Sequence, residues 1–572
     1  MRRPLLLLVL TCVASLAAPA ASPAHPERPT VFPAYKVVGP PKYRTTGTAL
    51  VVCQRDSGAR LKRIYKGRGA KTRRELRRRL KLLKKCRFRE IQPAVNAARS
   101  GYRILIMPGV YTEPASRTTP FVQPGDASKC GEDFAVTEGF DNTAPPPAGP
   151  SSADPPVRPN RNHHIKCPNS RNLIAIIGDE RLEEDAAAPS DPVCRRLCNL
   201  QIEGYGKTAK DVLITSDRRK TDVIRADRTN GIYLRRFTIE NGAFNGIDIV
   251  ETDGFTVKEI EARFNQNYGI LSFTATNGLY DRIDGHHNGD SGVYPGSGMK
   301  GCALENHDLY GTCEKLGCQR WTTEIRNSRS HDNVLGYSGT AGNSTYVHDN
   351  EFDNNSAGLT TDSFASGHPG MPQECFKWER NKIHSNNNNL FSAENQQKCA
   401  AGGTTFDQRP QDLVCPQFQV PVGTGVLVAG GNRNLLRENW IYDNWRWGVA
   451  QLGVPAAVRG DDDPAHQTDT SNGNRYVDNR MGVRPDGTRD PNGVDFWWDE
   501  QGVGNCWQGN MGAGGAATTS DPILVPGCAK PSNSAASNPL KLGRQVPCTA
   551  WDPKRNPRPV GCDWFDVGPE PQ

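Results

Sequence analysis

The chain has 572 residues, of which 36% are hydrophobic, 57 are glycine and 43 are proline, and its mean hydropathy is -0.62. This polar composition argues against a helical bundle or a protein with many membrane spans, and it favours short strands joined by many turns. The net charge of +8 is concentrated in one segment and does not describe the whole surface. We therefore expect a mostly β protein. Its length predicts several domains unless an internal repeat extends one of them.

Residues 1–20 are predicted to be a secretory signal peptide. Two arginines precede an apolar run, and Ala18-Pro19-Ala20 supplies the small residues of a cleavage site. A lipoprotein signal ending at Cys12 is the alternative, but the residues before this cysteine suit it poorly. No other stretch reaches the ~20 apolar residues of a membrane span. We expect a secreted, extracellular protein with no membrane span.

The segment between Gln54 and Glu90 is strongly basic, with 17 Lys or Arg against three acidic residues. Leu76, Leu80 and Leu83 recur at helical spacing, which indicates an amphipathic helix. In an exported protein such a charge suits acidic polysaccharides, teichoic-type polymers or lipid headgroups, and nucleic acid is not expected. The alternative is a solvated helix that packs its leucines against a neighbour.

A repeat dominates the middle of the chain. A polar residue or glycine stands four residues before a marker glycine, and successive glycines are separated by 23, 23, 44 and 22 residues. The 44-residue step is interpreted as two turns of 22. The pairs are Gly242/Gly246, Asn265/Gly269, Asn288/Gly292, Asp332/Gly336, Asn354/Gly358, Asn444/Gly448 and Asp478/Gly482, with Asn386/Leu390 as a degenerate member. Alternating apolar stretches follow most markers, and three short strands per repeat predict a parallel β solenoid. From Gly246 to Gly482 we expect about nine coil steps, or about 43 Å.

The polar residues of the repeat are predicted to stack at the corners of the solenoid. Carboxamides one coil apart can donate to and accept from each other, and Asn tolerates left-handed backbone at a turn. A second series, Asn327, Asn350, Asn381 and Asn439, precedes the markers by eight or nine residues. The predicted turn ladder consists of Asn265, Asn288, Asp332, Asn354 and Asn444.

These features resemble the right-handed parallel β-helix of the pectate-lyase-like superfamily. The segment FREIQPAVNAARSGYRILIMPGVYTEP, residues 88–114, is similar to that family's helical cap and first strand. The resemblance implies an all-β fold, a right-handed parallel β-helix with an N-terminal helical cap and a C-terminal cap. We expect a cap and first coil with the basic insert over 45–140, the β-helix over 165–485 and a cap or tail over 486–572.

Cysteine content supports export. Without Cys12, 16 cysteines remain, which favours disulfides in an oxidising compartment. Zinc is the weaker alternative, because the close pairs Cys194/Cys198 and Cys313/Cys318 lack partners at metal-site spacing.

Strand alternation predicts which side chains face outward. The predicted substrate-binding residues are Asp248, Phe273, Tyr294 and Thr360, because exposed rings beside polar groups suit a carbohydrate groove. The alternative is that inserted loops cover the aromatic rings.

The candidate catalytic residues are drawn from two polar clusters. Asp281, Asp284 and His286 lie with His287 and Asp290 in the densest one, and Asp362 and Lys377 belong to a second. Carboxylates near histidines could transfer protons or bind a hard cation such as calcium, whereas the alternative is a polar turn.

We therefore predict a monomer that acts on or binds a polysaccharide or cell-wall polymer, with an acidic glycan as the preferred class. The enzyme would be a polysaccharide lyase or a glycoside hydrolase. The motifs of polygalacturonase-like hydrolases are not found as a set, and Gly367-His368-Pro369 is the nearest match to their histidine motif. The Tyr-Gly-x-Asp-Pro-His motif of alginate-epimerase-like proteins is absent. The alternative is a non-catalytic cell-surface or matrix protein that binds glycan or has a structural role.

Overall fold

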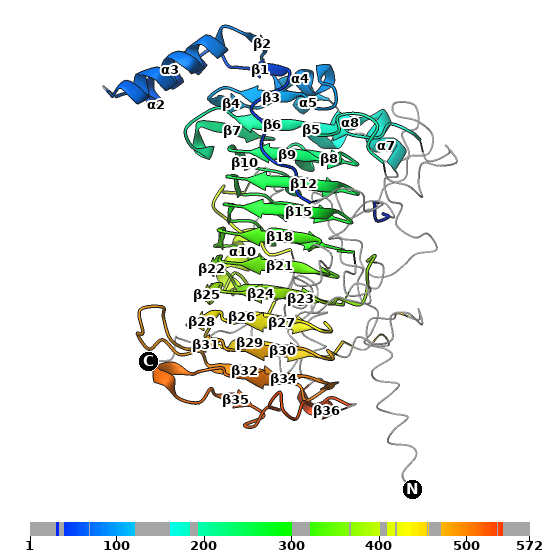
Figure 1. The fold of residues 1–572 in the computed structure, drawn as a ribbon, viewed down its shortest axis with the longest axis vertical. Coiled ribbons are helices and arrows are strands. Elements are labelled where there is room, and N and C mark those ends of the chain that lie inside the picture. The colour runs from blue at the N-terminus through cyan, green and yellow to red at the C-terminus, as the bar shows by residue number, and fades with distance from the viewer. Residues whose placement is uncertain are drawn as a thin grey trace.

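The structure is a computed structural model, which describes residues 30–33, 39–67, 69–119, 161–182, 193–299, 321–364, 368–400, 409–417, 420–454, 456, 461, 471–534 and 536–541. The predicted signal peptide and the Cys313/Cys318 pair lie outside these ranges. Three long parallel sheets form the faces of a right-handed β solenoid (Figure 1). The all-β prediction is confirmed.

Each coil contributes one strand to sheet A, then one to sheet B, then one to sheet C. Sheet A contains β1 (Ala49–Val52), β2 (Cys86–Phe88), β3 (Arg103–Ile106), β6 (Gln201–Gly204), β9 (Ile232–Arg235), β12 (Asp253–Lys258), β15 (Thr276–Asp281), β18 (Thr323–Arg326), β21 (Thr345–His348), β24 (Lys377–Glu379), β27 (Leu435–Arg437), β30 (Arg475–Val477) and β34 (Cys506–Gln508).

The other two faces are built in the same way. Sheet B contains β4 (Gly109–Tyr111), β7 (Val212–Thr215), β10 (Thr238–Glu240), β13 (Glu261–Arg263), β16 (Asp284–His286), β19 (Arg329–His331), β22 (Glu351–Asp353), β25 (Lys382–His384), β28 (Trp440–Tyr442) and β31 (Arg480–Met481). Sheet C contains β5 (Asn172–Ile177), β8 (Asp222–Asp227), β11 (Asn245–Val250), β14 (Ile270–Phe273), β17 (Ser291–Gly296), β20 (Leu335–Tyr337), β23 (Ala357–Asp362), β26 (Thr424–Ala429), β29 (Trp447–Leu452), β32 (Val494–Trp498) and β35 (Ser520–Asp521).

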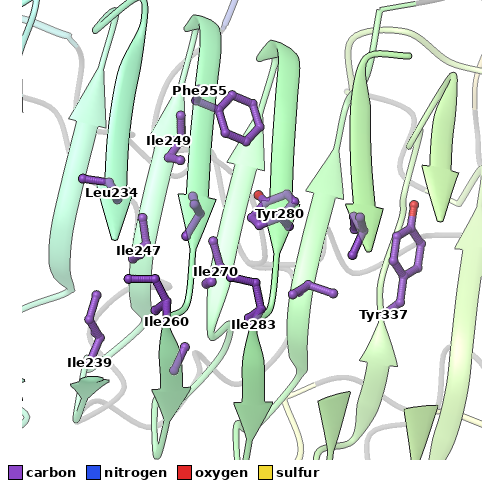
Figure 2. Packing of buried hydrophobic residues seen from close by; sticks show 14 of the residues in the cluster. Leu234, Ile239, Ile247, Ile249, Phe255, Ile260, Ile270, Tyr280, Ile283 and Tyr337 are labelled. Carbon is purple, nitrogen blue, oxygen red and sulfur yellow. The ribbon is translucent and has the colours of Figure 1, made fainter. Parts of the chain in front are cut away.

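The interior of the solenoid is filled by stacked apolar side chains from all three sheets. Ile247 pairs with Ile270, which pairs with Val293, so one side chain of each coil lies over the next. Figure 2 shows this packing, with Ile249 and Phe255 beside the same column. The residue after each marker glycine faces inward in these coils, as predicted, because strand residues alternate between the two faces.

The spacing of the glycines is partly misinterpreted by sequence reasoning. β17 pairs directly with β20, so the 44-residue step from Gly292 to Gly336 is one coil with an insertion. Gly482 follows β31 of sheet B, and the sheet C strand of that coil begins only at Val494. The solenoid also continues past residue 485 through β32, β34 and β35. The predicted number of coils between these glycines is therefore too high, because long insertions lengthen individual coils.

An asparagine ladder runs along the corner between sheets B and C. Each Nδ2 donates to the carboxamide oxygen of the next coil: Asn265 to Asn288 (2.9 Å), Asn288 to Asn333 (2.9 Å), Asn333 to Asn355 (3.1 Å), Asn355 to Asn386 (3.0 Å), Asn386 to Asn444 (3.0 Å) and Asn444 to Asn492 (3.1 Å). The predicted members Asp332 and Asn354 are wrong by one residue. Both have left-handed backbone with φ of 55°, which turns the chain so that the following asparagine faces inward.

A second ladder occupies the corner between sheets A and B. Its amides donate from Asn350 to Asn381 (3.0 Å), Asn381 to Asn439 (3.0 Å), Asn439 to Asn479 (3.0 Å) and Asn479 to Asn510 (2.9 Å). Asn327 is not a member, because it holds the left-handed corner position itself and Ser328 takes the ladder site.

Helices cover the N-terminal end and one insertion. They are α2 (Ser57–Ile64), α3 (Ala70–Leu83), α4 (Ile91–Ala97), α5 (Pro114–Thr118), α7 (Arg161–Lys166), α8 (Pro168–Arg171) and α10 (Ala393–Ala400), with the short 3₁₀ helices η1 (Ala209–Asp211) and η6 (Ala513–Gly515). An antiparallel pair, β33 (Gly502–Val503) and β36 (Asn533–Ser534), lies at the C-terminal end. In the described ranges, no helix is both long and apolar enough to cross a membrane.

Disulfide bonds crosslink the N- and C-terminal caps and the insertions. Cys53–Cys86, Cys194–Cys198, Cys399–Cys415 and Cys506–Cys528 are bonded. Cys194 and Cys198 pair with each other, which agrees with the interpretation of these cysteines as disulfides and not as zinc ligands.

Candidate functional site

Long segments of the chain connect sheet C to its neighbouring sheets. Between sheets C and A they comprise residues 178–200, 297–322, 363–376 and 453–474, and between sheets B and C they comprise 112–171 and 385–423. The turns between sheets A and B are short along most of the solenoid. Binding residues are often found beside loops of this length, so the outer face of sheet C is the strongest candidate for a binding site.

Two outward columns cross sheet C at the positions that strand alternation predicts. Asp248 pairs with Leu271 and Leu271 with Tyr294, while Val250 pairs with Phe273. Thr360 lies further along the same face, on β23. Their apolar members form clusters separate from the interior core, which confirms that they face outward.

The expectation that the aromatic residues are exposed is wrong. Phe273 and Tyr294 are each only 1% exposed. The ring of Tyr294 packs against Tyr268 with centroids 4.7 Å apart, and His368, from the 363–376 insertion, lies edge-on to Phe273 at 5.4 Å. Insertions therefore bury the aromatic column, as the alternative interpretation of the sequence proposed.

The 385–423 insertion covers the C-terminal half of the same face. Leu390, Phe391 and Val414 join an apolar cluster with strand residues such as Leu427 and Trp447. The Cys399–Cys415 disulfide and a hydrogen bond from the Gln417 N–H to the carbonyl of Gly289 (2.9 Å) hold this insertion near β17.

Four side chains under these insertions form what we call the carboxyl–tyrosine cluster: Tyr268, Asp290, Tyr294 and Asp362. Burial raises the pKa of Asp290 to about 8, and the negative charge of Asp362 adds to the rise. Burial also raises the pKa of Asp362 to about 6, although the Phe364 N–H (3.1 Å) and the Thr340 hydroxyl (2.8 Å) donate to it. Burial raises the pKa values of both tyrosines further, so both remain neutral donors.

One atom of the cluster is notable for its lack of partners. Among the residues that the structure describes, Oδ1 of Asp290 is buried without a hydrogen-bond partner. In the same ranges, no lysine or arginine forms an ion pair with Asp290 or Asp362. Hydrogen bonding of the Asp290 carboxyl with Ser291 and Tyr268 lowers its pKa but does not offset burial. A buried carboxyl oxygen without a partner costs about 1–3 kcal/mol, so Oδ1 is open to a hydrogen bond from a ligand.

The other predicted residues of sheet C have structural contacts. Asp248 accepts a hydrogen bond from Arg225 at 2.9 Å, and this guanidinium also lies 3.4 Å from Asp227. Thr360 is buried, and its hydroxyl donates weakly to the carbonyl of Tyr337 at 3.4 Å.

Asp284 and His286 lie on sheet B, not on sheet C. Oxygens of Glu261 and Asp284 and a ring nitrogen of His286 lie within 4.8 Å of one another and could hold a metal ion. Calcium does not suit this set, because it prefers oxygen ligands and avoids imidazole. Glu261 already pairs with Arg263 at 3.0 Å, so a guanidinium competes with any metal ion here.

Asp281 and Lys377 lie on sheet A. Asp281 pairs with Lys258 at 2.6 Å. Burial alone would raise the pKa of Asp281, but the ammonium of Lys258 outweighs it, so the pKa is lowered. Lys377 lies 3.5 Å from Glu379 and 5.1 Å from the ring centre of Tyr346. The five predicted catalytic residues therefore occupy three faces of the solenoid and do not form one site.

Sequence reasoning did not select Tyr268 or assign Asp290 to this face. Asp290 stands two residues before its marker glycine, at a corner where strand alternation does not predict the direction of a side chain. Its signals in the sequence were its membership of the densest polar cluster and its place beside a marker that also carries an outward tyrosine, Tyr294.

The three parallel sheets, the short corners and the stacked asparagines define a right-handed parallel β-helix. The chain is similar in structure to the A-module of the Azotobacter vinelandii mannuronan C-5 epimerase AlgE4, with 11% identity, 78% of this chain and 95% of that one covered, and a TM-score of 0.40. It is similar to pectate lyase Pel9A, with 11% identity, coverage of 86% and 82%, and a TM-score of 0.35.

A mutant form of the periplasmic alginate epimerase AlgG is also similar, with 14% identity, 55% of this chain and 61% of that one covered, and a TM-score of 0.28. Neither a protein-family model nor a curated protein matches the sequence. At these identities and TM-scores, the similarities assign no activity to this chain.

Proposed function

We propose that this protein binds and cleaves an acidic polysaccharide at the carboxyl–tyrosine cluster on the outer face of sheet C. The single observation that supports this most is the unpartnered Oδ1 of Asp290, buried beside the phenol of Tyr268. Two carboxyls whose pKa values differ can divide the roles of acid and base between them.

Hydrolysis is the chemistry that this pair suits best. At neutral pH Asp290 holds its proton and Asp362 is mostly ionised. Asp290 donates its proton to the glycosidic oxygen as the bond from that oxygen to the anomeric carbon breaks. Asp362 takes a proton from water, and the water oxygen bonds to the anomeric carbon. A lyase would need a basic residue beside the acids, and in the described residues neither carboxyl pairs with a lysine or an arginine.

The substrate class follows from charge, and the location follows from the cysteines. The exposed surplus of positive charge near the N-terminus favours a polyanionic glycan. The disulfides favour an oxidising, extracellular location. We propose that the protein acts there as a monomer, since nothing in the cluster calls for a second copy.

A second candidate is a non-catalytic glycan-binding or structural protein. The specific observation in its favour is burial, because Asp290, Tyr268 and Tyr294 are at most 3% exposed. Substrate could reach them only if the insertions over sheet C move.

The test uses purified protein with polygalacturonate and with alginate, following reducing ends and the ultraviolet absorbance of unsaturated products. We expect reducing ends without unsaturated products, and at least a ~100-fold loss of rate in Asp290→Asn and in Asp362→Asn. Asp486→Asn, the same change at an exposed site, should keep full activity. Unsaturated products would show elimination instead, and no product from either polymer would support the non-catalytic candidate.

A further inference from the structure

A helical hairpin stands apart from the sheets at the N-terminal end of the solenoid. Figure 1 shows α2 and α3 extending sideways beyond the first strands of the stack. We call residues 54–90 the basic hairpin. It carries 17 Lys or Arg against three acidic residues, and the cleavage chemistry proposed above does not use it.

The hairpin is firmly attached through its apolar side. The Cys53–Cys86 disulfide joins its two ends. Leu61 is buried, and Leu76, Leu80 and Leu83 pack with it against the N-terminal end of the solenoid, which contributes Val51, Met107 and Tyr205. This packing explains the helical spacing of the leucines and leaves the opposite side of α3 to solvent.

A buried arginine strengthens the same contact. The guanidinium of Arg79 lies 4.4 Å from the ring centre of Tyr205 and 4.9 Å from that of Tyr65. Its side chain is 8% exposed, so it acts in packing and does not contribute to the solvent-facing charge. The hairpin is therefore a preorganised support that holds the backbone of α3 in place, with its cationic side chains exposed.

The exposed side of α3 presents parallel rows of cations. Arg74, Arg78 and Lys81 follow one another at helical spacings of four and three, and Arg73 and Arg77 form a neighbouring row. The Cβ atoms of successive residues in a row lie about 5–6 Å apart, and the 14-residue helix is about 21 Å long. In the described part of the hairpin, the salt bridges are those of Arg60 with Asp56 and of Arg78 and Arg79 with Glu75. Within the described ranges, most of these cations therefore form no salt bridge with an acidic side chain.

We propose that the basic hairpin is a binding surface for an acidic polysaccharide, separate from the cluster on sheet C. Like charges in such rows repel one another, and a polymer that carries a carboxylate on each unit relieves this repulsion along the whole helix. Arginine suits carboxylates because its planar fork can donate two hydrogen bonds at once. Binding here tethers the protein to its polymer at a site remote from sheet C.

A lipid bilayer is a poorer partner for this surface. Peripheral helices insert exposed large apolar side chains between headgroups. Among the described residues of the hairpin, none of the large hydrophobic side chains is exposed, because the leucines are committed to the N-terminal end of the solenoid. Nucleic acid is also a poorer partner, since the disulfide that closes the hairpin belongs to an oxidising compartment.

The test measures binding of the full chain to polygalacturonate, with dextran as the neutral polymer and anionic phosphatidylglycerol vesicles as the lipid surface. The main variant changes Arg73→Gln, Arg74→Gln, Arg77→Gln and Lys81→Gln, because glutamine keeps helix propensity while removing charge. A charge-preserving variant has Arg73→Lys, Arg74→Lys, Arg77→Lys and Lys81→Arg. The matched control removes four exposed charges elsewhere through Lys382→Gln, Lys398→Gln, Arg480→Gln and Arg489→Gln.

We expect the natural chain to bind polygalacturonate and not dextran, with affinity that falls as salt is raised from about 50 to about 200 mM. The glutamine variant should bind at least ~10-fold more weakly and with a shallower salt dependence, while the charge-preserving and control variants stay within about threefold. Equal affinity in the glutamine variant, equal binding to dextran, or binding to vesicles but not to the polymer would overturn the proposal. Asp290→Asn should retain this binding, so failure at sheet C is distinguishable from failure here.

Discussion

The imidazole Nε2 of His331 lies 3.1 Å from the carboxylate Oδ1 of Asp284, one coil earlier on sheet B. On its other side, Nδ1 lies 2.6 Å from Asp332, the left-handed residue of the next corner. The ring is thus held between one strand and one corner, and it stacks on His286 at 5.0 Å. The same arrangement recurs at His348 with Glu324 and Asp349, at His384 with Glu351 and Ser385, and at His286 with Glu261 and His287.

The histidine contact predicts a pH dependence of stability. Burial lowers the pKa of His331, but hydrogen bonds to Asp284 and Asp332 outweigh it and raise the pKa to about 9 from 6.5. Folding therefore favours the protonated ring, and this stabilisation is complete below about pH 6.5 and lost as the pH rises through about 9. The pKa of Asp284 is lowered despite its burial, so its share is lost as the pH falls below about 3.8.

His331→Gln should accordingly reduce the free energy of unfolding by about 1–2 kcal/mol near pH 6, a value discounted because Asp284 is half exposed. Urea unfolding from pH 4 to pH 10 measures it. The difference between the two proteins should shrink above about pH 9, and a constant difference at every pH would contradict the assignment.

The ladder register gives a second prediction. Asn333→Ala should destabilise the protein by about 3 kcal/mol, because it removes one amide contact and leaves two donors of Asn288 buried without an acceptor. Asn354→Gly should cost less than about 1 kcal/mol, because its side chain is exposed and its φ of 55° suits glycine. Thermal unfolding compares the two, and a larger loss at residue 354 would contradict the observed register.

The cluster on sheet C predicts a bell-shaped activity profile. The acidic limb should follow ionisation of the base near pH 6, and the alkaline limb should follow loss of the proton near pH 8, since the pKa of Asp362 is about 6 and that of Asp290 about 8. These values belong to the coupled pair. Measuring kcat/KM across this range tests the assignment, and a rate that keeps rising above pH 8 would exclude Asp290 as the acid.

Removal of the Cys399–Cys415 disulfide should make the 385–423 insertion the preferred site of proteolysis. Replacing both cysteines by serine releases a loop with a sequence separation of 16, which corresponds to about 3 kcal/mol of local stability. Proteolysis within residues 385–423 should accelerate by roughly 100-fold, while the coils remain intact. Serine at Cys506 and Cys528 is the matched control and should leave this cleavage rate unchanged.

Much of the fold was predictable from local patterns. The alternation around Ile247 and Ile270 and the 23-residue spacing of Asn265 and Asn288 each has a short-range cause. Inward apolar residues, amide pairing across one coil and positive φ at a corner act within a few residues of each other in space. The sequence therefore determined the sheet type, the coil length and the outward direction of Asp248, Phe273 and Tyr294.

The tertiary structure decided what depends on the path of the insertions. It showed that the step from Gly292 to Gly336 is one coil, that Asn333 and not Asp332 stacks, and that Phe273 and Tyr294 are buried. It separated Asp281, Asp284 and Asp362 onto three faces, and it placed Asp290 beside Tyr268. Strand alternation does not predict side-chain direction at a corner or the segment that covers a face, because both depend on contacts between residues distant in the chain.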